Sequence, residues 1–452
     1  MRTIGSVLVA LRTLRTHERW TRAQIDAHQQ EALAALRAFA RHASPFYQQF
    51  YRGYETAPLA ELPVLTKRIL MDNFDSFVTD RSLRLSDVRA HVDQGSVGSF
   101  HRAYEVVATS GSTGMPGIFL FNSGEWATIM ASFARAREWA GIKLQLTRRS
   151  RMVVVSSTNE RNVSARVGRA ADTPFIPTLR LDATTPLSDI VMALNEWQPE
   201  VLVGYASMVH FLAAEQVRGA LDIHPRAVFA SSEVLTKQMR QRIISVWDDV
   251  VFDEYASTET AMIAAEDVGH HGMHLFEDLL IVENVDANNQ PVPPGSFGEK
   301  LLVTVLFSRT QPLIRYEISD SVRFAESAAD CRLPFQVVDA VQGRQEDILL
   351  MPGPSGGLIN VHPNVFHDVM DAIPNRGWQV VQEQDCLEIL VMPAGIPDPD
   401  KVRASVAAAL GAHGITDLRT TVRTVDAIPK SVSGKSPLIK AYRPPEPTRR
   451  LG

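Results

Sequence analysis

The densest run of chemically useful side chains is a short loop between two apolar segments. The segment reads Val106-Val-Ala-Thr-Ser-Gly-Ser-Thr-Gly-Met-Pro-Gly-Ile-Phe-Leu-Phe121. Its residues Thr109 to Gly114 combine hydroxyl side chains with glycines, so they can offer backbone N–H groups and rotatable hydroxyls to phosphate oxygens. A plain Ser/Gly turn has the same composition, so the loop by itself leaves both interpretations open.

Other common phosphate and zinc-protease motifs are missing from the sequence. The triplet Gly434-Lys435-Ser436 resembles the end of a Walker loop, but the position that must be glycine in that motif is Pro429. No G-x-G-x-x-G or H-E-x-x-H run occurs. The sequence therefore excludes a Walker loop and lacks the fingerprints of a Rossmann dinucleotide site and of a zinc protease.

Four further segments follow the loop in a characteristic order. They are Glu254-Tyr-Ala-Ser-Thr-Glu259, Tyr316-Glu-Ile-Ser-Asp320, Gly343-Arg-Gln-Glu-Asp347 and Pro429-Lys-Ser-Val-Ser-Gly-Lys435. Taken singly, such residues also occur as core aromatics, turn formers, ion-pair partners and solvated charges. Taken in order over nearly the whole chain, they resemble the motifs of the adenylate-forming enzymes, which include acyl- and aryl-CoA ligases, adenylation domains and luciferases. The phenylacetate-CoA ligase branch is the most similar, by chain length, by the stretch His274-Leu-Phe-Glu-Asp278 and by the form of the loop.

The resemblance implies a role for each motif residue toward ATP and Mg²⁺. The implied ATP-binding residues are Thr109, Ser110, Gly111, Ser112, Thr113, Gly114, Ser232, Glu233, Tyr255, Asp320 and Arg344. Within this set, the loop is implied to hold the β- and γ-phosphates, Tyr255 to stack on adenine, and Asp320 to accept hydrogen bonds from both ribose hydroxyls. Thr258 is implied to bind the α-phosphate, and Glu259 to ligate Mg²⁺, a hard cation suited to carboxylate oxygen.

The same resemblance implies that Lys435 is catalytic, together with Thr258 and Glu259. Lys435 is expected to bring a mobile positive charge to the reacting carboxylate and α-phosphate. The segment Met351 to Gly357, on the same small domain, is expected to face the acceptor of the second half-reaction. One rigid arrangement cannot easily serve both steps, so we expect the small domain to turn about Glu346, at the hinge position of its motif.

The acyl pocket is expected between several strands of the large domain. Its implied lining is Phe119, Phe121, Gly204, Tyr205 and Ser231. Aromatic lining favours a flat or apolar acid, although a core role suits the two phenylalanines equally well. The segment from Ser231 to Leu235 also fits a plain strand-to-helix turn with a serine N-cap.

Two departures from the family pattern bear on this interpretation. The phosphate loop ends in Pro116-Gly117, where the family usually has Pro-Lys, so one phosphate-contacting cation is missing. The phenylacetate branch also tolerates another residue there, so the change bears on the branch more than on activity. The loop Met351-Pro-Gly-Pro-Ser-Gly-Gly-Leu-Ile-Asn360 is longer than expected, which leaves the identity of the acceptor open.

The elements that must position these residues alternate along the chain. Short apolar runs such as Met152 to Ser156 alternate with helical stretches such as Leu187 to Trp197, which predicts an α/β fold. We expect a large multi-layer α/β domain over residues 1–345, with a basic helical leader over 1–60. The leader is expected to dock on the main body rather than to lie on a membrane surface. Residues 346–452 are expected to form a small, mobile α+β lid domain.

The composition narrows the class of protein and its setting. The 452 residues carry 46 Lys+Arg against 51 Asp+Glu, so the net charge of −5 gives no general attraction to nucleic acid. The two cysteines, Cys331 and Cys386, lie far apart in sequence and fit a reducing, cytoplasmic setting. The apolar run from Ile4 to Leu11 is too short to span a bilayer. We expect no membrane and no nucleic-acid partner.

The expected reaction is the ATP-dependent activation of a carboxylic acid as an acyl-adenylate, with release of pyrophosphate. The acyl group is then expected to pass to the thiol of coenzyme A. Two alternatives stay open. One is transfer to an acyl carrier protein or to an amine, and the other is a nucleotide-binding protein without catalysis, against which the presence of Glu259 and Lys435 argues.

Overall fold

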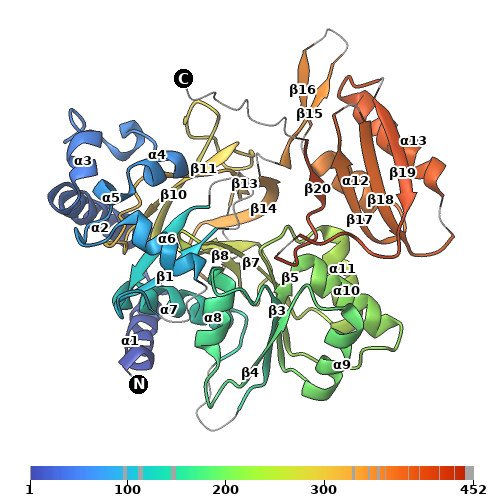
Figure 1. Ribbon diagram of the computed structural model, residues 1–452, viewed down its shortest axis with the longest axis horizontal. Coiled ribbons are helices and arrows are strands. Elements are labelled where there is room, and N and C mark those ends of the chain that lie inside the picture. The colour runs from blue at the N-terminus through green and yellow to red at the C-terminus, as the bar shows by residue number, and fades with distance from the viewer. Residues whose placement is uncertain are drawn as a thin grey trace.

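The computed structural model describes residues 2–94, 99–109, 116–143, 149–327, 331–344, 347–353, 357–361, 363–384, 386–396, 398–416, 418–431 and 433–442. Figure 1 shows a large body, coloured from blue to yellow, and a smaller body in orange and red beside it. The mixed arrangement of sheets and helices confirms the predicted α/β class.

The large body is built on a sheet that has nine strands within the described residues, in the order β13-β14-β9-β8-β7-β6-β5-β3-β4. Their bounds are β3 Met152–Ser156, β4 Thr178–Asp182, β5 Val201–Tyr205, β6 Ala227–Ser231, β7 Val251–Ser257, β8 Ala261–Glu266, β9 Met273–Leu275, β13 Asp320–Phe324 and β14 Val337–Arg344. Neighbouring strands from β4 to β7 run parallel, and those from β7 to β13 run antiparallel. Every residue of β3 and β8 is buried, as in strands covered on both faces.

Helices connect the parallel strands, as parallel pairing requires. They are α8 Val163–Ala171, α9 Leu187–Trp197, α10 Ala206–Val217 and α11 Lys237–Trp247, with α7 Ser123–Trp139 before β3. A capping box starts α7, because the Asn122 side chain accepts the Glu125 N–H and the Glu125 side chain accepts the Asn122 N–H. Further strands pair beside the main sheet. They are β1 Tyr104–Ala108, β2 Ile118–Asn122, β10 Leu280–Val285, β11 Lys300–Val305 and β12 Tyr316–Ile318.

The N-terminal segment is helical and docks on the main body. Its elements are α1 Arg2–His17, α2 Arg22–Ala43, α3 Pro45–Phe50, the 3₁₀ helix η1 Leu59–Glu61, α4 Lys67–Asp72, α5 Phe74–Phe77 and α6 Leu85–Asp93. Helix α1 packs along α7, where Arg15 Nε donates to Glu138 Oε2 at 2.7 Å. His17 Nδ1 lies 2.8 Å from Asp278 Oδ2. The basic side chains are thus used to attach this segment to the large body. None of the described helices is both long and apolar enough to cross a membrane.

The small body has a sheet and a core of its own. Its elements are β15 Leu349–Pro352, β16 Leu358–Val361, α12 Asn364–Asp371, β17 Asn375–Gln382, β18 Cys386–Pro393, α13 Pro399–Ala412, β19 Arg419–Thr424 and β20 Ile439–Lys440. The strand order is β19-β18-β17-β20, and β15 pairs with β16 in a separate hairpin. One hydrophobic cluster draws its buried members only from this body, among them Leu349, Trp378 and Leu410. Figure 1 shows β17 facing α10 and α11 of the large body.

Candidate active site

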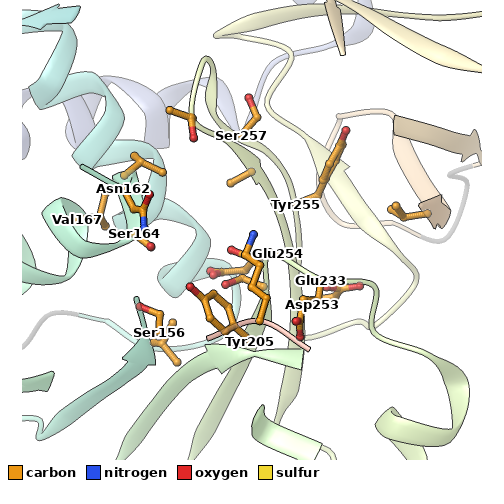
Figure 2. Close-up of a pocket in the computed structure, with 18 of the residues that line it drawn as sticks. Ser156, Asn162, Ser164, Val167, Tyr205, Glu233, Asp253, Glu254, Tyr255 and Ser257 are labelled. Atoms are coloured by element: carbon orange, nitrogen blue, oxygen red, sulfur yellow. The ribbon is translucent and has the colours of Figure 1, made fainter. Parts of the chain in front are cut away.

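A large cleft opens at the carboxyl ends of the parallel strands and has a volume of about 3870 Å³. Ser156 ends β3, Tyr205 ends β5 and Ser231 ends β6, and all three line the cleft. The register sets Tyr205 opposite Ser231, and Ser231 opposite Glu254 of β7. Figure 2 shows Tyr205, Glu254 and other side chains from neighbouring strands around one space. This edge of an open α/β sheet is where ligands commonly bind.

The small body reaches this cleft through residues 429–431 and 433–435. Lys430 Nζ donates to the Ala183 carbonyl at 2.6 Å, and the Tyr205 hydroxyl donates to the Ser433 carbonyl at 3.2 Å. Gly434 adopts φ +81°, and a Cβ added there would lie 2.7 Å from the Ala183 Cβ. Only glycine therefore allows both this backbone conformation and this close approach.

Lys435 is thereby brought to the predicted pocket. Its Nζ lies 5.5 Å from the centroid of the Tyr205 ring, within the range of a cation–π contact. Burial raises the pKa of Tyr205 to about 12, so the phenol stays neutral at physiological pH. The same hydroxyl accepts the Ser157 N–H at 2.9 Å. The ring is therefore held between the large body and the segment that carries Lys435.

Tyr255 and Asp320 come together although they lie far apart in sequence. The Tyr255 hydroxyl donates to Asp320 Oδ2 at 2.6 Å. Asp320 begins β13 and is paired in register with Arg344, the last residue of β14. Both Tyr255 and Asp320 line the cleft. The side chain of Arg344 lies outside what the structure describes.

Thr258 and Glu259 follow β7 in a turn that lines the same cleft. The Tyr316 hydroxyl donates to Glu259 Oε1 at 3.3 Å, and burial raises the pKa of Tyr316 well above its ordinary value. In the described part of the chain, no group of three or more His, Cys, Asp or Glu side chains could hold a metal ion. A single carboxylate such as Glu259 suits Mg²⁺, which binds proteins through one or two carboxylates and takes its other ligands from substrate phosphates and water.

The predicted phosphate loop is described only at its base. The Thr109 N–H donates to the Gly117 carbonyl at 2.9 Å, and the Gly117 N–H donates to Thr109 Oγ1 at 2.8 Å. These two bonds extend the pairing of β1 with β2 by one step. The predicted residues Ser110, Gly111, Ser112, Thr113 and Gly114, and the predicted hinge Glu346, lie outside the described residues.

Lys67 is a cleft residue that the sequence interpretation missed. It is the first residue of α4, and its side chain lies beside Gly117, where an added Cβ would be 3.3 Å from Lys67 Cδ. The missing lysine at position 117 thus leaves space that another lysine side chain occupies. No local pattern marks Lys67, because the two positions are 50 residues apart in sequence and meet only through the fold.

Phe119 and Phe121 belong to the core, which was the alternative role open to them. Both are buried in β2, and neither lines the cleft among the described residues. Phe119 packs edge-on against Tyr316 at 6.1 Å between ring centroids, and Phe121 packs against Trp126 at 6.3 Å. Residues 118–121 of β2 are all buried, and of these only Ile118 lines the cleft. The lining of the cleft therefore gives no support to their predicted place in the acyl pocket, which stays a prediction.

Glu233 lines the cleft, but its carboxylate is engaged by protein N–H groups. Oε2 accepts the Ser207 N–H at 2.9 Å, and Oε1 accepts the Ser436 N–H at 2.8 Å. Burial raises the pKa of Glu233, while the Ser207 and Ser436 hydrogen bonds and the nearby Lys435 charge act in the opposite direction. The preceding residue, Ser232, is exposed and lines the cleft.

Two charged side chains beside the pocket were also missed. Glu254 pairs with Arg137 of α7, whose guanidinium lies 3.8 Å from the Phe229 ring centroid. Burial lowers the pKa of Arg137 to about 9. Asp253, on the opposite side of β7 from Glu254, has its pKa raised to about 8 by burial and by the charge of Glu266. Adjacency to Tyr255 was the only sequence signal that could have pointed to these two acids.

Comparison with known proteins adds the following. No family model matches the sequence. Protein CapK of Staphylococcus aureus is 25% identical over 271 residues, which cover 59% of this chain and 54% of that protein. A phenylacetate-coenzyme A ligase of Thermus thermophilus is 23% identical over 375 residues, which cover 78% of this chain and 76% of that protein. The chain thus spans about half the length of CapK and three quarters of the length of the ligase.

Similar solved structures include 2-hydroxyisobutyryl-CoA ligase in complex with its acyl-AMP, in the postadenylation state. The TM-score is 0.74 at 19% sequence identity, and the match covers 94% of this chain and 91% of that one. The same ligase in its thioesterification state gives a TM-score of 0.59. These matches cover both bodies and confirm the resemblance predicted from the motifs. The chain has the fold of the adenylate-forming CoA ligases.

Proposed function

We propose that the chain is an AMP-forming ligase that activates a carboxylic acid with ATP and passes the acyl group to coenzyme A. The observation that carries this proposal is the docking of Lys435 beside Tyr205, in a cleft that also holds Tyr255, Glu259 and Asp320. The similar 2-hydroxyisobutyryl-CoA ligase, crystallised with its acyl-AMP, supports the same chemistry.

The chemistry needs positioning and charge neutralisation more than covalent help from the protein. A carboxylate oxygen of the acid attacks the α-phosphorus of ATP, the bond to the bridging oxygen breaks, and pyrophosphate leaves. The acid is already ionised at neutral pH, so no general base is required. Lys435 supplies positive charge at the reacting carboxylate and α-phosphate. In the second step the thiol sulfur attacks the acyl carbon, the thiol proton is lost, and AMP leaves.

The nucleotide is assigned to the side of the cleft formed by β7 and β13. Tyr255 offers an aromatic face for adenine, while Asp320, with Arg344 beside it in register, lies where it can accept ribose hydroxyls. Thr258 and Glu259 lie nearer the α-phosphate, and Glu259 is the residue that would hold Mg²⁺. That ion, when bound, offsets phosphate charge.

Lys67 takes the place of the phosphate-contacting lysine that is missing at position 117. The Lys67→Met variant keeps the length of the side chain and removes its charge, so we expect the KM for ATP to rise about 10-fold, as for the loss of one charged hydrogen bond. Arg41→Met, at an exposed cationic side chain of α2 that does not line the cleft, is the control and should keep the wild-type KM for ATP. Equal KM values for Lys67→Met and the wild type would contradict the assignment.

The acid itself is proposed to carry polar groups. An apolar acid was expected from a lining of Phe and Tyr side chains. Of these, Tyr205 lines the cleft, whereas Phe119 and Phe121 pack in the core. The walls labelled in Figure 2 include Ser156, Ser164 and Glu254, and Glu254 is buried with Arg137. An unsubstituted ring against this buried ion pair would leave the remaining hydrogen-bonding capacity of both charged groups unsatisfied, which is costly. A hydroxylated or otherwise hydrogen-bonding acid is the better match.

Pyrophosphate exchange into ATP, measured over a panel of carboxylic acids, tests the proposal. The panel should contain matched pairs, such as hydroxylated and unsubstituted acids of one chain length. Exchange with the polar member of each pair is the expected result, whereas exchange only with the unsubstituted acids would contradict the polar assignment. No exchange with any acid would instead support a nucleotide-binding protein without catalysis.

The acceptor is tested by adding coenzyme A to the protein with ATP and an acid that supports pyrophosphate exchange. The measured product is the acyl-CoA thioester. Coenzyme A is favoured because the similar 2-hydroxyisobutyryl-CoA ligase has been crystallised with it. Adenylation without thioester formation would favour the alternatives of a carrier-protein thiol or an amine.

The small body is proposed to turn between the two steps, which agrees with a TM-score of 0.74 to the postadenylation state against 0.59 to the thioesterification state.

A further inference from the structure

Glu233 connects the two bodies of the molecule at the point where Lys435 enters the cleft. Its two carboxylate oxygens accept N–H groups from different bodies, Ser207 of the large one at 2.9 Å and Ser436 of the small one at 2.8 Å. Ser207 lies in the first turn of α10, where N–H groups lack partners within the helix and attract negative charge. The large body therefore binds the Glu233 carboxylate through Oε2, and Oε1 is left to accept a hydrogen bond from the small body.

The backbone conformation of Ser232 sets the direction of the Glu233 side chain. Ser232 has φ +65°, a left-handed conformation that is costly for a residue with a Cβ. Such a conformation persists only where the surrounding contacts hold it. Here it follows directly after the last residue of β6, so the chain turns out of the sheet and directs Glu233 toward α10 rather than along the cleft.

The bond to Ser436 acts directly on Lys435, because the two residues are neighbours in the chain. With the Ser436 N–H held by Glu233 and the Ser433 carbonyl held by Tyr205, both flanks of Lys435 are fixed to the large body. The Glu233 carboxylate and the Lys435 ammonium also attract each other. A short backbone segment tied on both sides has few ways to place its side chain.

We propose that Glu233 is a positioning residue that holds the small body in the arrangement for adenylation, and that it acts through Lys435 rather than by binding ATP. This inference rests on the proposed function, since it assumes that Lys435 serves the first half-reaction. The bond to Ser436 must break when the small body turns for the second half-reaction, whereas the bond to Ser207 can stay. Glu233 therefore stabilises the arrangement for adenylation relative to the arrangement for acyl transfer.

The test compares Glu233→Gln with Glu215→Gln as a control. The Glu215 carboxylate on α10 pairs with Arg218, which directly follows this helix, and has no bond to the small body in the described structure. Glutamine keeps the size of Glu233, but its NH₂ group cannot accept an N–H, so one of the two bonds is lost. We expect the kcat of pyrophosphate exchange to fall about 10- to 100-fold, the factor for a charge-assisted hydrogen bond. The KM for ATP and the rate of thioester formation from supplied acyl-adenylate should stay at wild-type values.

A second measurement needs no activity. Cys331 lies in the large body and Cys386 in the small one, and both are partly exposed, so the native chain can carry one spin label on each. We expect the label-to-label distance distribution of the nucleotide-free protein to lose its docked component in Glu233→Gln and to keep it in Glu215→Gln. If wild-type protein shows no exchange with any acid, the proposed function fails, and this measurement still decides whether Glu233 holds the small body.

Three outcomes would overturn the inference. They are an unchanged distance distribution, a raised KM for ATP with kcat kept, and equal losses in both half-reactions. If Glu233→Gln does not fold, Ser436→Pro removes the same hydrogen bond from the small body, since proline has no N–H. The same shift in the distance distribution is expected there, and its absence would contradict the inference.

Discussion

Lys435→Ala is expected to lose adenylation while keeping the second half-reaction. In the docked arrangement the Lys435 ammonium lies over the carboxyl ends of the parallel strands, 5.5 Å from the Tyr205 ring centroid. A cation there stabilises negative charge that develops only while the carboxylate attacks the α-phosphorus. Loss of one such preorganised contact lowers the rate by roughly 10²–10³-fold. The measurement is pyrophosphate exchange at saturating ATP and acid.

The second half-reaction is measured separately, with synthetic acyl-adenylate and coenzyme A. Thioester formation should proceed at close to the wild-type rate, because the small body is proposed to have turned by then, so that Lys435 no longer lies at the phosphate. Lys401→Ala is the matched control, since Lys401 is an exposed lysine on α13 of the same small body and does not line the cleft. Normal pyrophosphate exchange by Lys435→Ala would refute the catalytic assignment.

Asp320→Ala is expected to raise the KM for ATP about 100-fold or more. The substitution removes a charged acceptor for two ribose hydroxyls, and each charged hydrogen bond is worth roughly 1.5–3 kcal/mol. It also leaves the Tyr255 hydroxyl without the partner that it contacts at 2.6 Å. Tyr255→Phe separates the two effects, because it removes only the bond between these side chains and keeps the ring. The KM for ATP of the Tyr255→Phe variant should rise much less than that of Asp320→Ala.

A nucleotide without the ribose 2′-hydroxyl tests directly whether Asp320 accepts a hydrogen bond from that hydroxyl. Wild-type protein should prefer ATP to 2′-deoxy-ATP, and Asp320→Ala should lose most of that preference, since the hydroxyl and its acceptor belong to one interaction. Equal preference in both proteins would place the ribose elsewhere. The roles of Lys435, Tyr255 and Asp320 toward ATP stay predictions until such measurements are made.

The parallel half of the sheet could be predicted closely from sequence. The apolar run Met152 to Ser156 is strand β3 to the residue, and the amphipathic stretch Leu187 to Trp197 is helix α9 to the residue. Strands covered on both faces are continuous apolar runs, and their connecting helices repeat every 3.6 residues, so local pattern suffices. The antiparallel strand β9, with three residues, carries too little pattern to be recognised.

The order of the motifs, read through their resemblance to one family, was enough to predict the fold and to name Lys435, Tyr255 and Asp320. Sequence could not determine which side chains face the cleft. From the sequence, Phe119 and Phe121 fit the core and the pocket equally well, and only the structure shows both of them buried and away from the lining of the cleft. Nor does any local signal join Lys67 to Gly117, or Glu233 to Ser436.

The helices and strands could be predicted, and the contacts in the cleft could not, because the interactions that form them act over different distances along the chain. Helix caps, amphipathic faces and strand patterns depend on neighbours within a few residues, so the sequence by itself determined the elements and their order. The Glu233–Ser436 and Tyr255–Asp320 contacts join residues 203 and 65 positions apart. Such pairs meet only after the sheet has set its strand order and the small body has docked, and that arrangement was decided by the tertiary structure alone.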